Sequence, residues 1–476
     1  MASRPLHVKE LAEFLAFDFD AGTIPTFLSD WRPEDPAHAV ISMCSSLLAI
    51  VKPLGGSPFV QFAHFSAMEY LTSMRLSKSK DTISRFHVST TSAHTIVAQA
   101  CLGVLLHLDE NVTKDSLEKF CLAEYAAEHW VEHALIENVS STVEDGMKRL
   151  FDPRRSHLSV WTWIYDPEDS ERRSRRSGRP GKARATSLHY AAFCGMHDIA
   201  AFLIIEHSQD VNARGFDNES SLHVASRCGH ADIAQLLLEH GADTAVQDDN
   251  NFTPLLLASQ GGAEEVARIL LKHGADIEAR DYRKRNPLLL ASEHGHVGVT
   301  RVLLEHGIDI EAREEGGWSP LELASFHGSV EVTRVLLDHG ADVKTQYKDN
   351  HAALHFAQGK EVTRLLLKHG ADANTLDIKD RTPLHHASEH GHIGAALALL
   401  EHGVDVNARD ANSVTPLHLA SRGGHPDVVR LLLQYGSDIH AQDDKGRIPF
   451  MGTTAKGDYS ITQLLSEYGV EDHGTF

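Results

Sequence analysis

The sequence lacks several features that would place it in a membrane or outside the cell. It has no run of about 18 apolar residues, the length that a membrane-spanning helix needs. Its first residues, MASRPLHVKELAEFLAFDFD, have no apolar block of the signal-peptide type. Its five cysteines are odd in number and unclustered, which is typical of reduced thiols rather than a disulfide framework. These absences predict a protein that is not secreted and has no membrane partner, located in the cytoplasm or alternatively in the nucleus.

Basic charge is also in short supply. Lys and Arg number 45 against 66 Asp and Glu, for a formal net charge of −21. A broad nucleic-acid surface needs a basic face, so the balance argues against nucleic acid as the main partner. Seven of the basic residues are concentrated in ERRSRRSGRPGKAR (171–184).

Motifs for nucleotide or acyl-transfer chemistry are missing too. The sequence contains no G-x-x-x-x-G-K-[ST] phosphate-binding loop. The nearest approach, GRPGK (178–182), has the wrong spacing between its glycines, and the Ala183 that follows lacks the required hydroxyl. It contains no G-x-S-x-G motif either. We therefore expect no ATPase activity and no cofactor.

An internal repeat dominates the rest of the chain. The block TPLHHASEHGHIGAALALLEHGVDVNARD begins at residue 382 and returns as TPLHLASRGGHPDVVRLLLQYGSDIHAQD at residue 415, which is 33 residues later. An apolar anchor marks nine copies: Leu188, Leu222, Leu255, Leu288, Leu321, Leu354, Leu384, Leu417 and Phe450. The sixth copy is shortened near residues 358–360, and the last departs from the motif as a terminal cap would.

Local signals within one copy predict a pair of helices. Thr382 is a natural N-cap, Pro383 suits the first helical turn, and Gly391 can end the helix in a left-handed conformation. A second helix follows, with Leu399 and Leu400 on an apolar face that one copy cannot bury alone. Stacked copies bury that face, and the chain turns out into a β-hairpin finger between them.

The period and the T-P-L-H-x-A pattern resemble the ankyrin repeat over roughly residues 186–470. The resemblance implies a mostly α protein whose residues 186–476 form an α-solenoid of nine repeats with β-hairpin fingers. It also implies protein–protein interaction through the finger tips and the outward, concave face of each first helix. By register, the candidate partner-binding residues are Phe252, Tyr282, Arg283, Arg285, Trp318, Phe326, His327, His351, Lys379 and Arg381. For Trp318, packing against an adjacent finger is an equal alternative.

Histidines are abundant, with a dense group at His385, His386, His390 and His392. The repeat accounts for most of them, because His385, His390 and His392 recur at matching places in other copies. Another series, which includes His273 and His306, stands just before the glycine that ends the second helix, where an imidazole can bond the last carbonyls. We therefore expect no metal site in the repeats.

The segment before the repeats has no such period. The strings LLAIV (47–51) and FVQFAH (59–64) flank a turn at 54–58, which predicts two strands with a wing between them. Helices are expected around Leu11 and over residues 37–48. We predict a winged-helix-like unit over residues 1–80, an all-α helical unit over 81–165 and a basic flexible linker over 166–185.

Residues 60–73, VQFAHFSAMEYLTS, together with LAEYAAEHW (122–130), resemble the region after the nucleotide-binding domain of fungal NACHT-type (STAND) signalling ATPases that carry ankyrin arrays. In that family the repeats are the sensing or partner-binding end. This resemblance implies a part of a signalling protein, without the ATPase domain.

His129, Glu132 and His133 have the H-x-x-E-H spacing of inverted zinc proteases. They also lie on an amphipathic helix whose stripe includes Trp130, and a catalytic site would need a third ligand. The sequence therefore favours a non-enzymatic interaction scaffold. A DNA-associated regulator that uses the winged helix and the basic linker is the first alternative, and a zinc hydrolase is the second.

Overall fold

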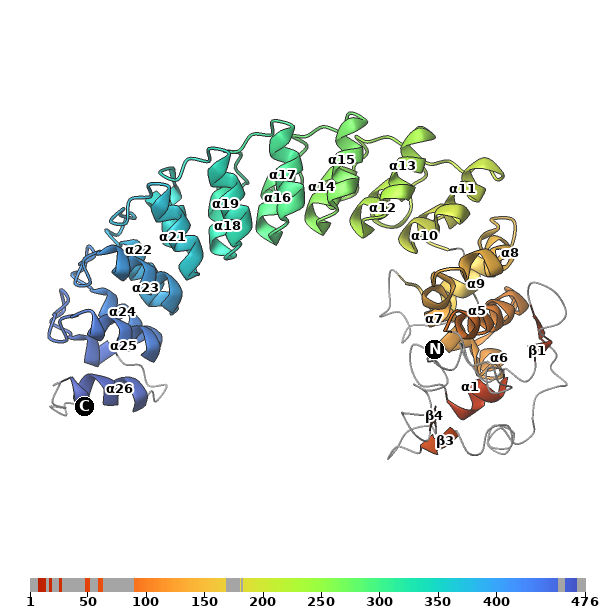
Figure 1. Ribbon diagram of the computed structural model, residues 1–476, viewed down its shortest axis with the longest axis horizontal. Helices are drawn as coiled ribbons and strands as arrows, with labels where there is room; N and C mark the ends of the chain where they lie inside the picture. The colour runs from red at the N-terminus through yellow and green to blue at the C-terminus, as the bar shows by residue number, and fades with distance from the viewer. Residues whose placement is uncertain are drawn as a thin grey trace, which may run out of the picture. The chain divides into compact units, whose positions relative to one another are not determined.

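The computed structural model describes residues 7–13, 17–18, 25–27, 48–51, 59–62, 90–167, 180, 183–452 and 459–468 (Figure 1). The chain divides into two compact units. One comprises Met1–Val224 with Glu239–Ala242, and the other comprises Ala225–Leu238 with Asp243–Phe476. None of the described helices has both the length and the apolar character needed to cross a bilayer.

The described N-terminal elements are a short helix and two small antiparallel hairpins. The helix α1 covers Val8–Glu13, and β1 (Phe17–Asp18) pairs with β2 (Thr26–Phe27). The strands β3 (Leu48–Val51) and β4 (Phe59–Phe62) pair with Leu48 opposite Phe62, which confirms the two predicted strands. The predicted turn at residues 54–58 lies outside the described residues. Residues 37–47 of the helix expected over 37–48 lie outside the described residues, and Leu48 begins β3. Most of the winged-helix-like unit also lies outside the described residues.

A helical unit follows, as the sequence predicts. Its helices are α5 (Thr90–His107), α6 (Lys114–Leu117), α7 (Ala123–Ala134), α8 (Ser140–Phe151) and α9 (His157–Ile164). Trp130, Phe151 and Trp161 are almost fully buried, with ring centroids 5.4–6.2 Å apart. The indole N–H of Trp161 donates to the Ala127 carbonyl over 2.8 Å, so α9 is fixed to α7.

The helical unit packs directly against the first repeat. The Trp161 ring lies 6.0 Å from that of Tyr190 in α10 (Ser187–Phe193), and the Lys148 ammonium lies 5.2 Å from the ring centroid of Phe202 in α11 (His197–Ile205). These contacts place the first repeat in the same compact unit as the helices before it. Most of the predicted basic linker, residues 168–179 and 181–182, lies outside the described residues.

The repeats form successive helix pairs, and those of the second unit follow one another side by side (Figure 1). The pairs are α10 (Ser187–Phe193) with α11 (His197–Ile205), α12 (Ser221–Cys228) with α13 (Ala231–Glu239), α14 (Pro254–Gly261) with α15 (Glu264–Lys272), α16 (Pro287–His294) with α17 (Val297–Glu305), α18 (Pro320–Phe326) with α19 (Val330–Asp338), α20 (Ala353–Phe356) with α21 (Lys360–Lys368), α22 (Pro383–His390) with α23 (Ile393–His402), and α24 (Pro416–Gly423) with α25 (Pro426–Gln434). In the last copy the 3₁₀ helix η7 (Pro449–Gly452) precedes α26 (Tyr459–Glu467).

The predicted helix boundaries are confirmed at α22. The Thr382 side chain accepts a hydrogen bond from the backbone N–H of His385, Pro383 begins the helix, and Gly391 ends it at φ 74°. The apolar face of the second helix is buried as expected, with Leu399 and Leu432 at most 1% exposed. Local capping and inter-repeat burial therefore specify the same helix pair.

The fingers differ in part from the predicted β-hairpins. Strand pairing occurs between β5 (Gln346–Tyr347) and β6 (His351–Ala352), which flank the 3₁₀ turn η6 (Lys348–Asn350). The connection between α11 and α12 has a 3₁₀ turn, η5 (Phe216–Asn218), closed by a single bridge. Five other described fingers are closed turns in which an aspartate Oδ1 accepts the backbone N–H groups two and four residues ahead. These aspartates are Asp248, Asp281, Asp377, Asp410 and Asp443.

The shortened sixth copy loses residues of its first helix, while the connection to the second helix keeps three residues, as in the fifth copy. The sequence places the loss between the two helices, whereas α20 has only 4 residues against 8 in α22. The chain leaves α20 in an extended conformation at Ala357 and enters α21 at Lys360, after Gly359. The deletion therefore removes the last turn of the first helix.

Candidate partner-binding surface

Some of the predicted partner-binding residues are buried and hold the repeats together. Phe252 is 7% exposed and packs in a cluster with Leu256 and Leu290. Arg285 is also 7% exposed, which corrects the expectation that it is free to contact a partner. Its position after the finger turns the side chain back onto the repeat instead of outward.

Arg285 ties its finger to the first helix of its repeat. Its Nε donates to Asp281 Oδ2 and its Nη1 to Glu293 Oε2, both over 2.8 Å. Burial opposes the positive charge, but the hydrogen bond and charge of Asp281, followed by those of Glu293, raise the pKa of Arg285. Arg381 makes the same pair of contacts, to Asp377 and Glu389, and is half-buried. Both arginines are therefore structural, and neither is an exposed contact.

Trp318 is half-buried between two repeats. Its ring centroid lies 4.2 Å from that of Phe356 and 5.4 Å from that of Phe326, and the side chain packs on the cluster of Leu289 and Leu323. Trp318 thus packs on side chains of the helices and not on an adjacent finger, and its part in partner binding stays a prediction. Phe326 is 40% exposed and continues this aromatic contact to the surface.

The exposed members of the predicted set are Tyr282, Arg283, Phe326, His327 and Lys379. Tyr282 is 51% exposed, and the Arg283 guanidinium lies 5.3 Å from its ring centroid, within the range of a cation–π contact. Sequence reasoning missed Ile378, which is 58% exposed at the tip of the finger before α22. Register could have found it, because Ile378 follows Asp377 as Tyr282 follows Asp281.

Neighbouring fingers are joined by backbone hydrogen bonds near these tips. The N–H of Tyr282 donates to the Asn250 carbonyl over 3.3 Å, and that of Ile378 donates to the Asp349 carbonyl over 2.9 Å. The Lys379 carbonyl in turn accepts from the N–H of Ala411 over 2.9 Å. The exposed tips are consequently held by main-chain contacts on the adjacent finger.

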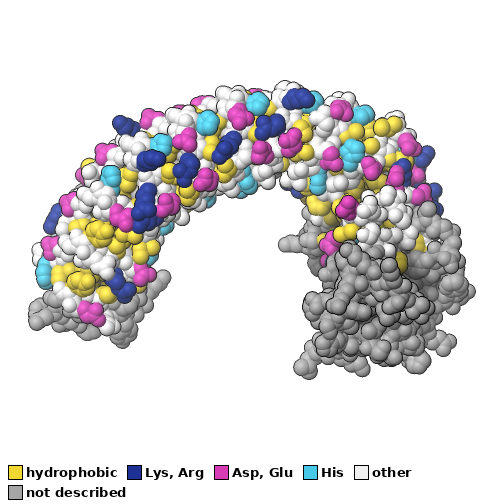
Figure 2. Space-filling view, in the orientation of Figure 1, with side chains coloured by type: hydrophobic (Ala, Val, Ile, Leu, Met, Phe, Trp, Pro, Cys, Tyr) yellow, Lys and Arg dark blue, Asp and Glu magenta, His cyan; other side chains and the backbone are white. Residues whose placement is uncertain are grey.

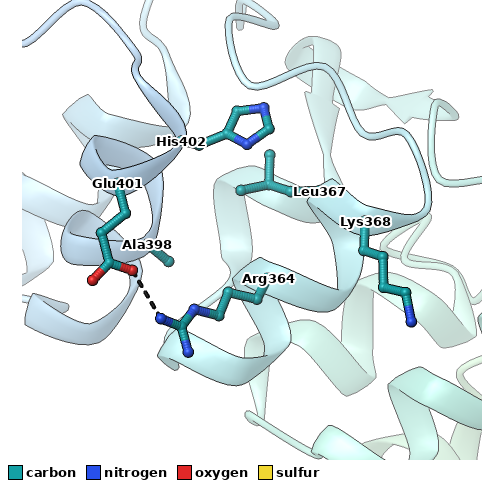
Figure 3. Close-up of a pocket in the computed structure, with 6 residues that line it drawn as sticks. All are labelled: Arg364, Leu367, Lys368, Ala398, Glu401 and His402. Carbon is teal, nitrogen blue, oxygen red and sulfur yellow. Dashed lines mark hydrogen bonds and ion pairs between the residues drawn. The ribbon is translucent and has the colours of Figure 1, made fainter.

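Charged side chains of both signs are interspersed over the visible face of the repeats (Figure 2). A hollow between α21 and α23 is lined by Arg364, Leu367, Lys368, Ala398, Glu401 and His402 (Figure 3). Both carboxylate oxygens of Glu401 are occupied, one by Arg364 at 2.9 Å and the other by Lys360 at 2.8 Å. The hollow is therefore a place where two repeats are joined by ion pairs.

Most repeat histidines have the structural contacts that the sequence suggests. His385 Nδ1 lies 2.8 Å from Thr382 Oγ1, and its Nε2 lies 3.1 Å from the Val414 carbonyl of the next finger. In the second-helix series, Nδ1 of His273 lies 2.9 Å from the Ile269 carbonyl, and that of His306 lies 2.7 Å from the Val302 carbonyl. The predicted bonding of the last carbonyls is confirmed at these positions.

His386 is different, because it meets a carboxylate and a second imidazole. Its Nε2 lies 3.0 Å from Asp377 Oδ2, and Nε2 of the predicted partner residue His351 lies 3.6 Å from the same oxygen. Burial lowers the pKa of His386 to about 3, so its imidazole is neutral at physiological pH. Burial opposes the charge of Asp377, but hydrogen bonds from the Arg381 backbone, His386, the Lys379 backbone and the Arg381 side chain hold its pKa below the usual range.

The H-x-x-E-H residues of α7 do not converge on one point. His133 is 1% exposed; its Nε2 lies 2.8 Å from the Tyr125 hydroxyl and its Nδ1 lies 2.7 Å from His94 Nδ1. His129 lies beside Glu128 and Glu132 of its own helix, at 3.6 and 3.5 Å. Since both ring nitrogens of His133 already have partners, this geometry favours a packing role over a zinc-protease site.

Comparison with known proteins gives matches to the repeats. Residues 188–281, 279–347 and 342–410 match a family model for three copies of the ankyrin repeat, and residues 399–450 match a second ankyrin-repeat model. The chain is 29% identical over 251 residues to azaphilone pigments biosynthesis cluster protein L of Monascus ruber. That match covers 50% of this chain and 52% of the relative, so the chain spans about half the length of the curated relative it matches.

Proposed function

Because residues 188–450 belong to the ankyrin-repeat family, we propose that this protein is a non-enzymatic scaffold that binds another protein. The observation that carries the proposal is the exposure of Tyr282 and Ile378, 51% and 58%, on fingers whose main chains are bonded to their neighbours. Aromatic and apolar side chains supply much of the binding energy at protein interfaces. Holding them in place beforehand lowers the entropy lost on association.

We define the partner surface by its exposed side chains: Tyr282, Arg283, Phe326, His327, Ile378 and Lys379. Its fingers and first helices match the two places through which the family resemblance implies contact. Arg283 and Lys379 add positive charge beside the apolar tips, which favours a protein segment with acidic and apolar side chains.

The partner surface can be tested by truncating three of its side chains together. The variant Tyr282→Ala/Phe326→Ala/Ile378→Ser is expected to lose capture of the main partner from an extract of the source cells. Tyr435→Ala is a matched control, because Tyr435 is 42% exposed but ends the second helix α25. Equal capture by the triple variant and by the control would contradict the assignment of this surface.

A finer proposal concerns the setting of this scaffold. The likeness of residues 60–73 and 122–130 to NACHT-type proteins supports a role as the sensing part of a signalling protein, in the cytoplasm. The curated relative is named for a pigment biosynthesis cluster. This proposal requires an oligomerising ATPase domain in the full gene product. Sequencing the transcript would detect it.

The basic tract supports a second candidate, a DNA-associated regulator in the nucleus. Seven basic residues within positions 171–184 can contact phosphates, and the predicted winged helix would read the duplex. A gel-shift assay with sequence preference, lost on mutating Arg172, Arg173, Arg175 and Arg176, would favour this candidate. Binding that does not depend on sequence would leave the scaffold as the better account.

A further inference from the structure

Three metal-ligating side chains meet at the junction of the sixth and seventh repeats. His351 comes from β6, Asp377 from the finger between α21 and α22, and His386 from α22. One ligand atom from each side chain lies within 4.8 Å of the other two. Nε2 of His386 and Nε2 of His351 are 3.0 and 3.6 Å from the same oxygen, Asp377 Oδ2.

The identity of residue 386 does not follow from the repeat. At the matching place five other copies of the second unit carry apolar residues, namely Leu257, Leu290, Leu323, Phe356 and Leu419. His386 is only 7% exposed, so a polar ring occupies a position that otherwise serves the core. A buried polar group is destabilising unless it has a hydrogen-bond partner, and the partner of His386 Nε2 is the Asp377 carboxylate, while the His351 ring lies 5.0 Å from the His386 ring.

We propose that His351, Asp377 and His386 bind one Zn²⁺ ion, with the fourth position open to water. Zinc bonds of about 2.0–2.1 Å in a tetrahedron place the ligand atoms roughly 3.3 Å apart, which is close to the two separations at Asp377. Two imidazoles and one carboxylate suit zinc better than magnesium or calcium, which favour oxygen ligands. The register of the histidines predicts no metal site in the repeats, and the proposal departs from that prediction at this cluster.

The position of the His386 ring suits a metal ligand. Its Nε2 lies 3.0 Å from Asp377 Oδ2, and the same nitrogen would bind the ion once the ring proton moves to Nδ1. His355 lies nearby, with its ring centroid 5.1 Å from that of His386, but its ring nitrogens already meet the Ala352 N–H and the Arg381 carbonyl. It therefore supports the cluster without serving as a ligand.

Arg381 is the principal competitor for the ion. Its Nε donates to Asp377 Oδ2 over 2.8 Å, while its Nη1 donates to Glu389 over 2.8 Å. Zinc binding requires the Arg381 Nε to lose its hydrogen bond to Asp377 Oδ2, while its Nη1 keeps the hydrogen bond to Glu389. The Asp377 Oδ1 contacts with the backbone N–H groups of Lys379 and Arg381 are independent of that exchange, so the finger keeps its turn.

A bound ion would join two successive fingers beside the copy whose first helix is shortest. His351 precedes α20, which has 4 residues, and Asp377 and His386 belong to the next repeat. The ion thus adds a cross-link where the helix contacts are reduced. Its role is structural, and it does not depend on the identity of the protein partner.

The test uses the whole chain, freed of metal by a chelator and titrated with zinc against a chromophoric zinc indicator. We expect the wild type to bind one equivalent that His386→Leu and His351→Leu both lose. His294→Ala is the matched control, because His294 is an exposed histidine at the end of α16, away from the cluster. It should keep the full equivalent.

Melting temperatures separate loss of the site from loss of the fold. His386→Leu introduces the residue that four other copies use, so it should melt cooperatively without zinc and show no upward shift when zinc is added. The wild type and His294→Ala should both shift upward. The proposal is overturned if the wild type fails to bind an equivalent of zinc, or if His386→Leu retains both the binding and the shift.

Discussion

The backbone nitrogen of Lys360 lies 2.8 Å from the point that a β-carbon on Gly394 would occupy. This close approach joins the start of α21 to the start of α23. It accompanies the deletion in the sixth copy, in which α20 ends at Phe356 and only three residues precede α21. The glycine at this position is therefore a packing requirement of the shortened repeat.

We expect Gly394→Ala to lower the free energy of unfolding by about 1–3 kcal/mol, the usual cost of overpacking against a group that cannot move. Gly298→Ala is the matched control at the same repeat position, where the added methyl would meet the movable side chain of Glu264. There the helix propensity of alanine should keep the change within about 1 kcal/mol of zero. Urea unfolding of both variants measures the difference, and equal midpoints would contradict the packing argument.

Arg285→Ala should be strongly destabilising. It removes the charge partner of Asp281, whose side chain is fully buried, and leaves Glu293 without its 2.8 Å contact. Breaking a buried ion pair from one side costs about 3–5 kcal/mol.

The adjacent Arg283 provides the control for that prediction. It is exposed, so Arg283→Ala should change the free energy of unfolding by no more than about 0.5 kcal/mol. Thermal or urea melts of the two variants test the contrast. If Arg285→Ala melts like Arg283→Ala, the contacts of Arg285 with Asp281 and Glu293 do not contribute to the free energy of unfolding.

Stability should fall as the pH drops below about 6.5, the ordinary histidine pKa. Burial lowers the pKa of His355 to about 4 and that of His386 to about 3, so between pH 6.5 and 4 the unfolded chain binds protons that the folded chain does not. Each such histidine contributes a slope of about 1.4 kcal/mol per pH unit, with stability greatest above pH 6.5.

The variant His386→Leu removes one of these histidines, so the slope between pH 6.5 and 4 should decrease by about 1.4 kcal/mol per unit in metal-free protein. His294→Ala removes an exposed histidine and should leave the slope unchanged. Urea unfolding at a series of pH values gives both slopes. An unaltered slope in His386→Leu would show that His386 is not held neutral by the fold.

The repeats could be predicted from the sequence because each copy contains residues that begin and end its own helices. Thr382, Pro383 and Gly391 act locally, and nine copies make the pattern unambiguous. The length of α20 was harder to predict, because a deletion specifies how many residues are lost and not which element gives them up. In the structure the first helix lacks its last turn, and Gly394 leaves room for the backbone of Lys360 at the start of α21.

The candidate site was predictable only in part. Register identified Tyr282 and Phe326 correctly as exposed, but it could not tell an outward arginine from one that folds back. Arg285 and Arg283 differ by two residues, and only the three-dimensional positions of Asp281 and Glu293 decide which is buried. The cluster at His386 likewise depends on residues from two fingers and a helix, which no local motif brings together.

The central claim, that the exposed finger tips bind a protein partner, is tested most directly by site-specific photo-crosslinking. A photoreactive phenylalanine analogue is placed at position 282 or 378 on the partner surface, or at position 435 as the control. We predict one crosslinked protein partner common to positions 282 and 378, and no such product from position 435. A partner crosslinked from position 435 and from neither finger tip would contradict the account.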